Sequence, residues 1–161
     1  MDTLKRIIGS GFGSGYTPVA PGTFGSLAAL VPLTVILLTV GWPGVALFAV
    51  LSSIATLWVT PACEESWGKD PGRLVMDEWA GQALPFLIIP STYAVPSTGI
   101  TILAAFMLFR LFDIWKPLFI NRLQELPGGW GVLTDDILAG FYTLICLKSV
   151  ILLFPDFFGV A

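Results

Sequence analysis

Histidine is absent from the 161 residues of this chain, and cysteine occurs only twice. Without histidine the protein has no phosphohistidine chemistry, no Ser-His-Asp triad and no histidine-ligated zinc. Neither Cys63 nor Cys146 begins a Cys-x5-Arg phosphate loop, since neither is followed six residues later by arginine. The sequence also has no Asp-x-Asp pair of the kind that supplies an aspartyl nucleophile. The groups left for chemistry are carboxylates, basic side chains, hydroxyls and backbone amides.

Charged residues are scarce as well. They make up 12% of the chain against 55% apolar residues, and the mean hydropathy is +0.85, whereas a soluble domain carries about 25% charged residues. The net charge of −3 has the wrong sign for a nucleic-acid partner, so we expect none. Residues 1–161 are predicted to form a single domain. The polar, glycine-rich stretch after Lys5 and Arg6 predicts no cleaved signal peptide.

Long apolar runs dominate the sequence instead. Five segments are apolar enough to enter a membrane: 26–40, 44–59, 79–89, 98–111 and 137–154. The first two lie near the short end of the roughly 17–25 residues that a spanning helix needs. The third is broken at Pro85 and closed by Pro90, and it crosses only if it extends to Tyr93 or Val95. The predicted fold class is all-α, a polytopic membrane helical bundle with about four to five membrane-embedded helices.

When these segments alternate across a membrane, the charged residues gather on one side. Residues 1–24, 60–78 and 110–136 contain seven of the eight basic and ten of the eleven acidic residues, whereas the opposite connections, 41–44 and 90–97, contain none. The general polarity of loops does not explain why one set of loops is uncharged. An excess of lysine and arginine marks the cytoplasmic side. We therefore predict a site built from loops on the cytoplasmic face.

Two acidic pairs precede apolar helical segments. Asp77-Glu78 stands before Trp-Ala-Gly, and Asp135-Asp136 before Ile-Leu-Ala-Gly, with Thr134 as a candidate helix N-cap. One interpretation is capping and helix-dipole complementarity, about 0.3–1 kcal/mol per charge. The other is a cation, because four crowded carboxylates repel one another unless a metal neutralises them. The two pairs together favour metal ligation, and Mg²⁺ is the expected ion because it prefers oxygen ligands.

Arg110, Asp113 and Lys116 recur at every third position before Pro117. On a helix this spacing places them broadly along one face, at the end of the fourth apolar segment. They form either an interfacial cluster whose long side chains reach the membrane surface, or a functional group in which Asp113 binds metal and the two bases bind phosphate oxygens. The residues by themselves leave both interpretations open.

Glycine is frequent ahead of the first apolar segment, in GSGFGSGYTPVAPGTFGS at 9–26. Glycines let backbone N–H groups approach an anion closely, and Thr23 or Ser26 is a candidate cap for the helix that follows. No Gly-Lys-Ser/Thr follows, so this is not a Walker loop. A flexible entry loop has the same composition, so the stretch is a weak signal when taken alone.

Taken together, these blocks give a chain that resembles the phosphatidylglycerophosphatase A family. The resemblance rests on four stretches in order, GFGSGYTPVAPGTFGSLAAL at 11–30, DPGRLVMDEWAG at 70–81, FRLFDIWKP at 109–117 and GGWGVLTDDILAG at 128–140. It implies Mg²⁺-dependent hydrolysis of phosphatidylglycerophosphate, a phospholipid substrate within the bilayer, at the inner face of a bacterial membrane. It also implies that the matching polar residues are functional: Asp70, Asp77, Glu78, Arg110, Asp113, Lys116, Asp135 and Asp136.

Roles within this set are predictions. The expected metal ligands are carboxylates: Asp70, Asp77, Glu78, Asp135 and Asp136. Phosphate is expected to bind Arg110 and Lys116, together with backbone amides near Gly22 and Thr23. The nucleophile is expected to be metal-activated water, and the alternative is an aspartyl-phosphate formed by an acidic side chain of the site. The predicted catalytic residues are Arg110, Lys116, Asp113 and Asp135, of which the last two are the candidate aspartyl nucleophiles.

A small transporter or cation pathway lined by carboxylates is the alternative function. Such a pathway needs charged groups inside the spans. Here every acidic cluster stands at the end of an apolar segment, and Lys148 is the charged residue that lies well inside one. The sequence therefore favours an enzyme.

Overall fold

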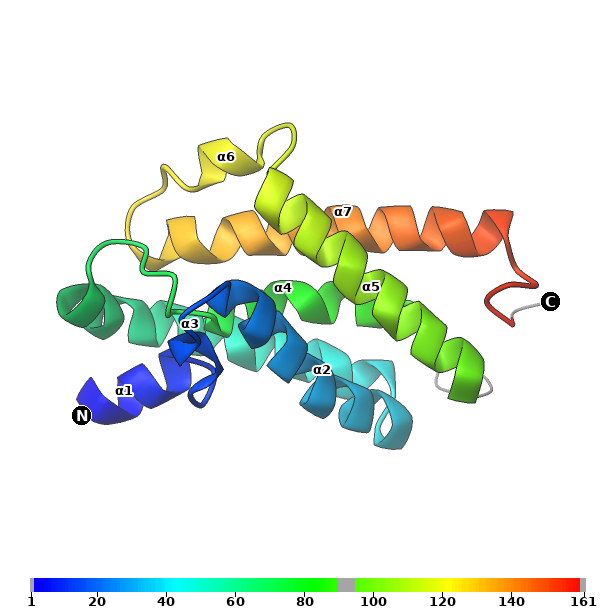
Figure 1. Ribbon diagram of the computed structural model, residues 1–161, viewed down its shortest axis with the longest axis horizontal. Helices are drawn as coiled ribbons and strands as arrows, with labels where there is room; N and C mark the ends of the chain where they lie inside the picture. Colours follow the sequence, from blue (N-terminus) through cyan, green and yellow to red (C-terminus); the bar gives the residue numbers. More distant parts are fainter. Residues whose placement is uncertain (1, 90–94, 160–161) are drawn as a thin grey trace.

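A computed structural model describes residues 2–89 and 95–159 of the chain. In these ranges the chain is all-helical, with seven α-helices, one short 3-10 helix and no strand (Figure 1). The elements, in chain order, are α1 Asp2–Gly9, η1 Ser14–Tyr16, α2 Pro21–Thr39, α3 Trp42–Trp67, α4 Met76–Phe86, α5 Val95–Trp115, α6 Ile120–Leu123 and α7 Gly129–Leu153.

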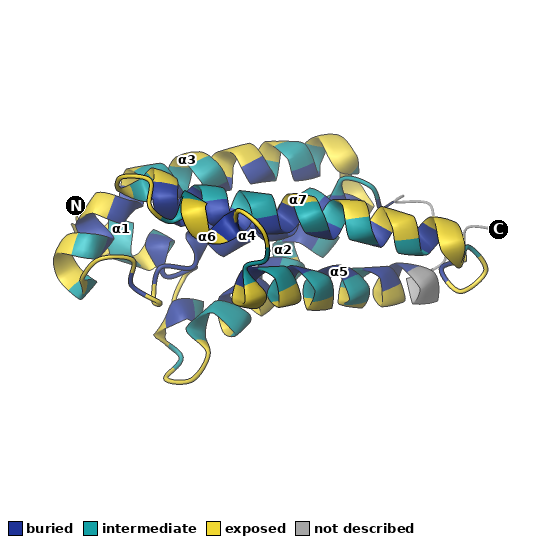
Figure 2. Ribbon diagram, turned by 90° about the horizontal axis from the view of Figure 1, so that it is seen from above, coloured by how far each residue is buried: buried dark blue, intermediate teal, exposed yellow. Residues whose placement is uncertain are grey.

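Four of the described helices, α2, α3, α5 and α7, are long and apolar enough by length and composition to cross a membrane. Their outward faces carry large apolar side chains, such as Leu47, Ile54 and Leu103, each about 60% exposed. Figure 2 shows this pattern, with buried residues turned inward and exposed ones outward along the long helices. An apolar outer surface of this extent suits contact with lipid. The predicted all-α membrane bundle is confirmed.

The structure settles the third apolar segment, whose crossing the sequence left open, as far as the described residues go. It forms α4, whose eleven residues rise only about 16 Å, which is too short to cross a bilayer. Pro85 lies in the last turn of this helix, and a turn follows at 87–89. The predicted extension to Tyr93 falls outside the described residues, and Val95 already belongs to α5. Four helices of spanning length are therefore present in the described chain, within the predicted four to five.

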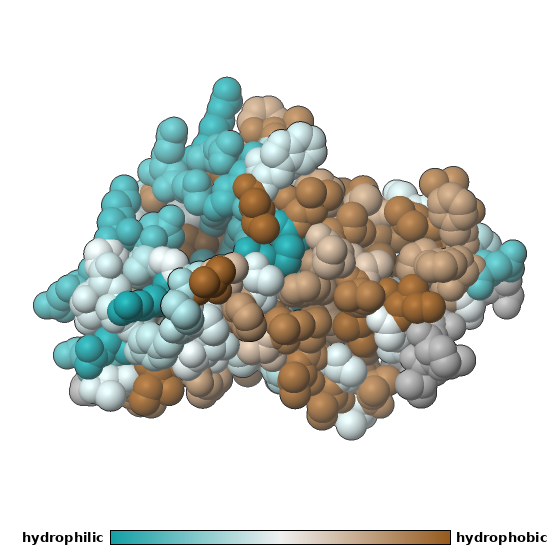
Figure 3. Space-filling model, viewed as in Figure 1, coloured by the Kyte–Doolittle hydropathy of each residue, from teal (hydrophilic) through white to brown (hydrophobic). Residues whose placement is uncertain are grey.

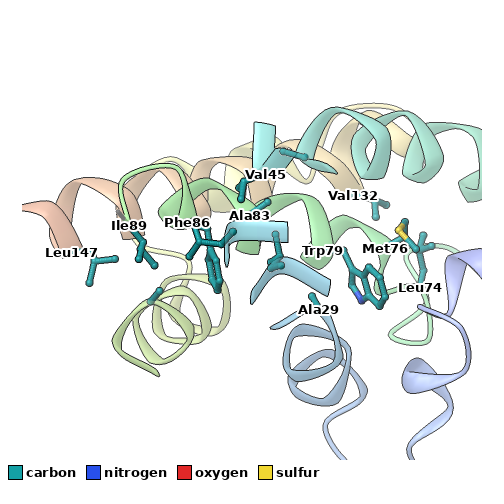
Figure 4. Packing of buried hydrophobic residues seen from close by; sticks show 14 of the residues in the cluster. Ala29, Val45, Leu74, Met76, Trp79, Ala83, Phe86, Ile89, Val132 and Leu147 are labelled. Carbon is teal, nitrogen blue, oxygen red and sulfur yellow. The ribbon is translucent and has the colours of Figure 1, made fainter. Parts of the chain in front are cut away.

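Helix α4 lies inside the bundle. It packs against α2, α3, α5 and α7, and all of its residues except Leu84 are buried. Side chains along α4, including Trp79, Ala83 and Phe86, form the middle of the apolar core and meet Ala29 of α2 and Leu147 of α7 within one continuous cluster (Figure 4). The four long helices thus enclose a short central one whose first turn carries an acidic pair.

Two glycines allow α4 and α7 to approach closely. A Cβ atom on Gly140 would meet the carbonyl oxygen of Gly81, and one on Gly81 would meet the carbonyl oxygen of Asp136. Small residues at such positions permit backbone-to-backbone packing of membrane helices. Asp77 lies four residues before Gly81, and Asp136 lies four residues before Gly140. The close crossing therefore brings the two acidic pairs to the same end of the bundle.

Several helices are longer than predicted. Helix α2 begins at Pro21 rather than Ser26, and α3 continues through Pro61 to Trp67 rather than ending at Val59. Proline at the first position of α2 suits a helix start because its missing N–H has no helical partner there. In α3, the Thr60 hydroxyl donates to a backbone carbonyl one turn earlier, in keeping with the tolerance of membrane helices for proline.

The predicted start of the last helix is wrong in a way that matters for the site. Helix α7 begins at Gly129 rather than Ile137, so Asp135 and Asp136 lie inside the helix and not at its start. Thr134 is not an N-cap, because its hydroxyl donates to the carbonyl of Trp130 within the same helix. The capping interpretation therefore does not apply to this acidic pair, although Asp77-Glu78 does lie in the first turn of α4.

Hydrophilic side chains gather at one end of the molecule. Figure 3 shows them over the end that carries α1 and α6, whereas most of the remaining visible surface is apolar apart from a smaller patch near the C-terminus. The start of α2, the end of α3, the start of α4, the end of α5 and the start of α7 lie toward this end (Figure 1). The one-sided distribution of charge expected from the sequence is present in the fold.

Candidate active site

A cavity of about 150 Å³ opens at the hydrophilic end. Its walls come from the start of α2, the loop between α3 and α4, the start of α4, the end of α5, the segment after α6 and the second turn of α7. Among the described residues that line it, six carry carboxylates and one carries an ammonium group. These charged residues are Asp70, Asp77, Glu78, Asp113, Asp135, Asp136 and Lys116.

Asp77 and Asp136 are buried carboxylates of the cavity wall, 8% and 3% exposed. Within the described chain, Asp77 Oδ1 has no hydrogen-bond partner, and neither residue forms a salt bridge there. Burial, reinforced by the nearby charges of Glu78, Asp135 and Asp113, raises the pKa of Asp77 well above its usual value. A buried carboxylate without a counter-charge is costly, so this position favours a proton or a cation.

Glu78, the neighbour of Asp77, has partners on two other helices. Ser26 of α2 donates a hydrogen bond to Glu78 Oε2 at 2.7 Å, and Arg110 Nη1 of α5 lies 3.4 Å from the same oxygen. Arg110 Nη1 also contacts Asp113 Oδ2 at 2.6 Å and donates to Ser26 Oγ at 3.3 Å. Burial raises the pKa of Glu78 to about 7, although the Arg110 guanidinium opposes this effect.

Lys116 is the partner of the second acidic pair. Its Nζ donates to Asp135 Oδ2 at 2.6 Å. The residue follows the end of α5 directly, in a left-handed backbone conformation with φ of 46°. Burial lowers the pKa of the Lys116 ammonium, but the hydrogen bond and charge of Asp135 outweigh this effect and raise the pKa above its usual value. Lys116 is therefore a protonated cation that faces the cavity.

Gly22, Thr23 and Asp70 complete the predicted set. Gly22 lines the cavity, and a Cβ atom there would meet Glu78 Oε1, so glycine leaves room for that carboxylate. Thr23 is half-buried on α2 and is not among the residues that line the cavity. Asp70 is exposed at the cavity rim, where its backbone N–H donates to Glu64 Oε1 at 3.2 Å.

The oxygen donors of the cavity are of the type that a hard cation such as Mg²⁺ prefers, but their positions do not form a complete coordination shell. Every acidic ligand in the cavity offers oxygen, which Mg²⁺ prefers. No group of three carboxylates within the described ranges converges as a ready-made metal site. In the same ranges Lys116 pairs with Asp135, and Arg110 pairs with Glu78 and Asp113. Mg²⁺ commonly takes one or two carboxylates and completes its shell with water and substrate phosphate. Asp77 and Asp136, which form no salt bridge in the described chain, are the carboxylates that such a coordination would use.

The sequence profile of the family described as Phosphatidylglycerophosphatase A matches residues 7–151 of this chain. The chain belongs to the phosphatidylglycerophosphatase A family. A phosphatidylglycerophosphatase A of Haemophilus influenzae is 38% identical, covering 90% of this chain and 87% of that protein. A phosphatidylglycerophosphatase A of Escherichia coli is 32% identical, covering 87% and 79%. A protein of Bacteroides thetaiotaomicron, provisionally named a phosphatidylinositol-3-phosphatase, is 41% identical, covering 89% and 91%. No solved structure matches the chain.

Membership of the phosphatidylglycerophosphatase A family makes the chain a lipid phosphatase, a phosphoric monoester hydrolase with membrane-embedded helices. The cavity is the feature of the described fold that suits this chemistry, because its polar walls lie at the ends of apolar helices. The family's four sequence blocks meet here: Gly22 comes from the first block, Asp77 and Glu78 from the second, Lys116 from the third and Asp136 from the fourth.

Sequence reasoning missed two polar residues of this candidate site. Ser26 was expected as a helix cap, but Ala20 precedes the first residue of α2, and Ser26 lies in the second turn with its hydroxyl on Glu78. The spacing of Gly22 and Ser26, four residues apart, was a signal that both face the same neighbour. Gln124, after α6, also lines the cavity. In the sequence Gln124 lies in the charged segment 110–136, where no motif indicated that it would line a cavity.

Proposed function

We propose that this chain is a Mg²⁺-dependent phosphatidylglycerophosphatase that works at the cytoplasmic face of a bacterial inner membrane. Family membership supports the reaction and the substrate. The excess of lysine and arginine on the charged side supports the cytoplasmic orientation. The lipid's acyl chains remain in the bilayer while its terminal phosphate reaches the ends of the spanning helices, where the cavity lies.

The negative charge of the cavity is the observation that supports a bound metal. A phosphomonoester is itself an anion, yet the described cavity wall has six carboxylates and a single ammonium group. Such a cavity repels phosphate unless cations neutralise the carboxylates. A divalent cation held by Asp77 and Asp136 removes that repulsion. Asp135, Glu78 and Asp70 are the further carboxylates within the same cavity that extend the metal site.

The remaining residues have separate tasks. When bound, Mg²⁺ supplies charge neutralisation and polarisation of the phosphate. Lys116 binds a phosphate oxygen after exchanging its contact with Asp135, and the backbone amides near Gly22, at the start of α2, add hydrogen bonds to the anion. Water is the nucleophile in this proposal. Attack by the carboxylate of Asp113 or Asp135 is the alternative. It would form a phosphoaspartate that borohydride reduces to homoserine, whereas direct attack by water forms no covalent intermediate.

Phosphate release from defined lipids tests the proposal. Purified full-length protein should release phosphate from phosphatidylglycerophosphate in the presence of Mg²⁺, and more slowly from phosphatidic acid. Phosphatidylinositol 3-phosphate belongs in the same assay, because the name of the Bacteroides relative points to that headgroup. A protein that hydrolyses only the inositol lipid would overturn the substrate assignment. A protein that hydrolyses none of the three would overturn the function.

The position of the charges argues against a cation pathway. In the described spanning helices the charged residues stand near the hydrophilic end, apart from Lys148 of α7. A pathway requires ionisable groups along the span. Ion flux into protein-containing vesicles would be the observation that favours the transporter alternative.

A further inference from the structure

Arg110 lies behind the cavity wall rather than in it. Its side chain is 13% exposed, and Arg110 is not among the described residues that line the cavity, whereas Glu78, Asp113 and Lys116 are. Its Nε has no hydrogen-bond partner in the described chain, so this donor does not reach the cavity's polar groups. Phosphate binding by Arg110 stays a prediction from the sequence, and the contacts of its guanidinium favour a different role. Of the described basic residues, Lys116 is the one that faces the space where phosphate would enter.

The ion pairs of Arg110 in the described chain join two carboxylates of the cavity wall, and its Nη2 lies beside Gly22. One guanidinium nitrogen, Nη1, lies 2.6 Å from Asp113 Oδ2 and 3.4 Å from Glu78 Oε2. The same nitrogen donates to Ser26 Oγ at 3.3 Å, and that hydroxyl in turn donates to Glu78 Oε2 at 2.7 Å. Ser26 is fully buried. The guanidinium and the hydroxyl together therefore fix one oxygen of Glu78 and one of Asp113.

The other oxygen of Glu78, Oε1, lies beside the start of α2. A Cβ atom on Gly22 would meet this oxygen, and both Gly22 and Glu78 line the cavity. Glycine at position 22 has no side chain and therefore leaves room for Glu78 Oε1. Helix α2 thus contributes two residues to one carboxylate: Gly22 makes room for Oε1, and Ser26 binds Oε2.

We propose that Arg110 and Ser26 are positioning residues that hold Glu78 and Asp113 from behind, so that the free oxygens of these carboxylates face the metal in the cavity. The inference rests on the proposed Mg²⁺-dependent function. In metal sites, residues that hydrogen-bond to the ligands from behind fix the orientation of those ligands. Their loss typically costs about 10–100-fold in metal affinity or activity. Phosphate binding then falls to Lys116 and the backbone near Gly22.

Two variants test the proposal on full-length protein without relying on turnover. Arg110→Lys keeps the positive charge but shortens the side chain and replaces the guanidinium whose Nη1 reaches both carboxylates. Ser26→Ala removes only the hydroxyl. Each variant should raise the dissociation constant of Mn²⁺, measured by electron paramagnetic resonance in the absence of lipid, about tenfold. The affinity for inorganic phosphate at saturating Mg²⁺, measured by ³¹P NMR titration, should stay within about threefold of wild type.

Matched controls make the same chemical changes elsewhere. Arg122→Lys alters an exposed arginine of α6, and Ser52→Ala alters a buried serine of α3; neither residue lines the cavity. Both controls should leave Mn²⁺ and phosphate affinities unchanged. Weakened phosphate affinity with normal Mn²⁺ affinity in Arg110→Lys would overturn the inference and return Arg110 to phosphate binding. Normal Mn²⁺ affinity in both test variants would also overturn it. Absence of Mn²⁺ binding by wild type would instead refute the metal-dependent function, and the inference with it.

Discussion

The two acidic pairs of the cavity have similar local sequences but are held from opposite directions. Asp77-Glu78 on α4 and Asp135-Asp136 on α7 each precede an Ala-Gly step that lets the two helices meet. In each pair one carboxylate has a basic partner, Arg110 for Glu78 and Lys116 for Asp135, while the other forms no salt bridge in the part of the chain that the structure describes. The pairs therefore supply one unpaired carboxylate each.

The difference lies in where the basic partner stands. Arg110 is behind the wall and shares Glu78 with a buried serine, so this pair is anchored from within the bundle. Lys116 lines the cavity itself, at the end of α5, so the contact with Asp135 is open to exchange. An anchored carboxylate keeps its geometry when substrate enters. In the proposed function, Lys116 would leave Asp135 to bind phosphate, and the Asp135 carboxylate would then be free to hold the metal.

Chelation tests whether both pairs depend on the same ion. Excess EDTA should reduce phosphate release from phosphatidylglycerophosphate to background, because the cavity then holds carboxylates without a divalent counter-charge. Added Mg²⁺ should restore full activity, which separates chelation from unfolding. Turnover that persists in excess chelator would show that the acidic pairs do not act through a metal.

Single substitutions compare the two unpaired carboxylates. Asp77→Asn and Asp136→Asn should each lower kcat by about 10³-fold or more, since metal stabilisation of the transition state is worth several kcal/mol. Helical content and membrane insertion should remain, as judged by circular dichroism and fractionation. Asp156→Asn, which changes an acid outside the cavity lining, serves as the control. Near-normal turnover in either variant would break the equivalence of the two pairs.

The architecture and the charged end were predictable because they follow from composition. Long apolar runs leave few alternatives to membrane helices, and a run of charged connections on one side fixes where polar chemistry gathers. The boundary of α7 was not predictable in the same way. Asp135 and Asp136 lower the local hydropathy, so the sequence suggested a loop, but their neighbours in space are other cavity residues. A helix continues through them because its polar face has partners there.

The anchoring of Glu78 depended on three-dimensional packing that one sequence does not display. Ser26 stands 52 residues before Glu78, and a serine ahead of an apolar run has the pattern of a helix cap. Arg110 likewise has the spacing of a face shared with Lys116. The position of the Arg110 side chain relative to the cavity depends on how α5 is rotated against α2 and α4. That position decides whether Arg110 can bind phosphate or only hold the neighbouring carboxylates. Only the fold sets that rotation.

Removing the exchangeable lysine sharpens the contrast with Arg110. Lys116→Met should lower kcat/KM on the order of 10²-fold, as expected when a group that stabilises developing negative charge is lost. The affinity for inorganic phosphate should fall in parallel, whereas Mn²⁺ affinity without phosphate should hold or increase, because the ammonium no longer competes for Asp135. Lys148→Met, on the same helix as Asp135 but outside the cavity lining, is the control. A loss of Mn²⁺ affinity in Lys116→Met would mean that both basic residues support the metal.

The smallest expected effect concerns the helix crossing that brings the pairs together. In Gly140→Ala, the new methyl group meets the backbone oxygen of Gly81, so α4 and α7 must separate at a cost of about 1–3 kcal/mol. Thermal unfolding in detergent should shift downward, and Mn²⁺ affinity should fall because Asp77 and Asp136 move apart. Gly99→Ala in α5 has open space around the new methyl group, and alanine is the better helix former by about 1 kcal/mol. This control should therefore be neutral or stabilising. Equal Mn²⁺ affinity in the two variants would show that the acidic pairs reach the metal without the close crossing of α4 and α7.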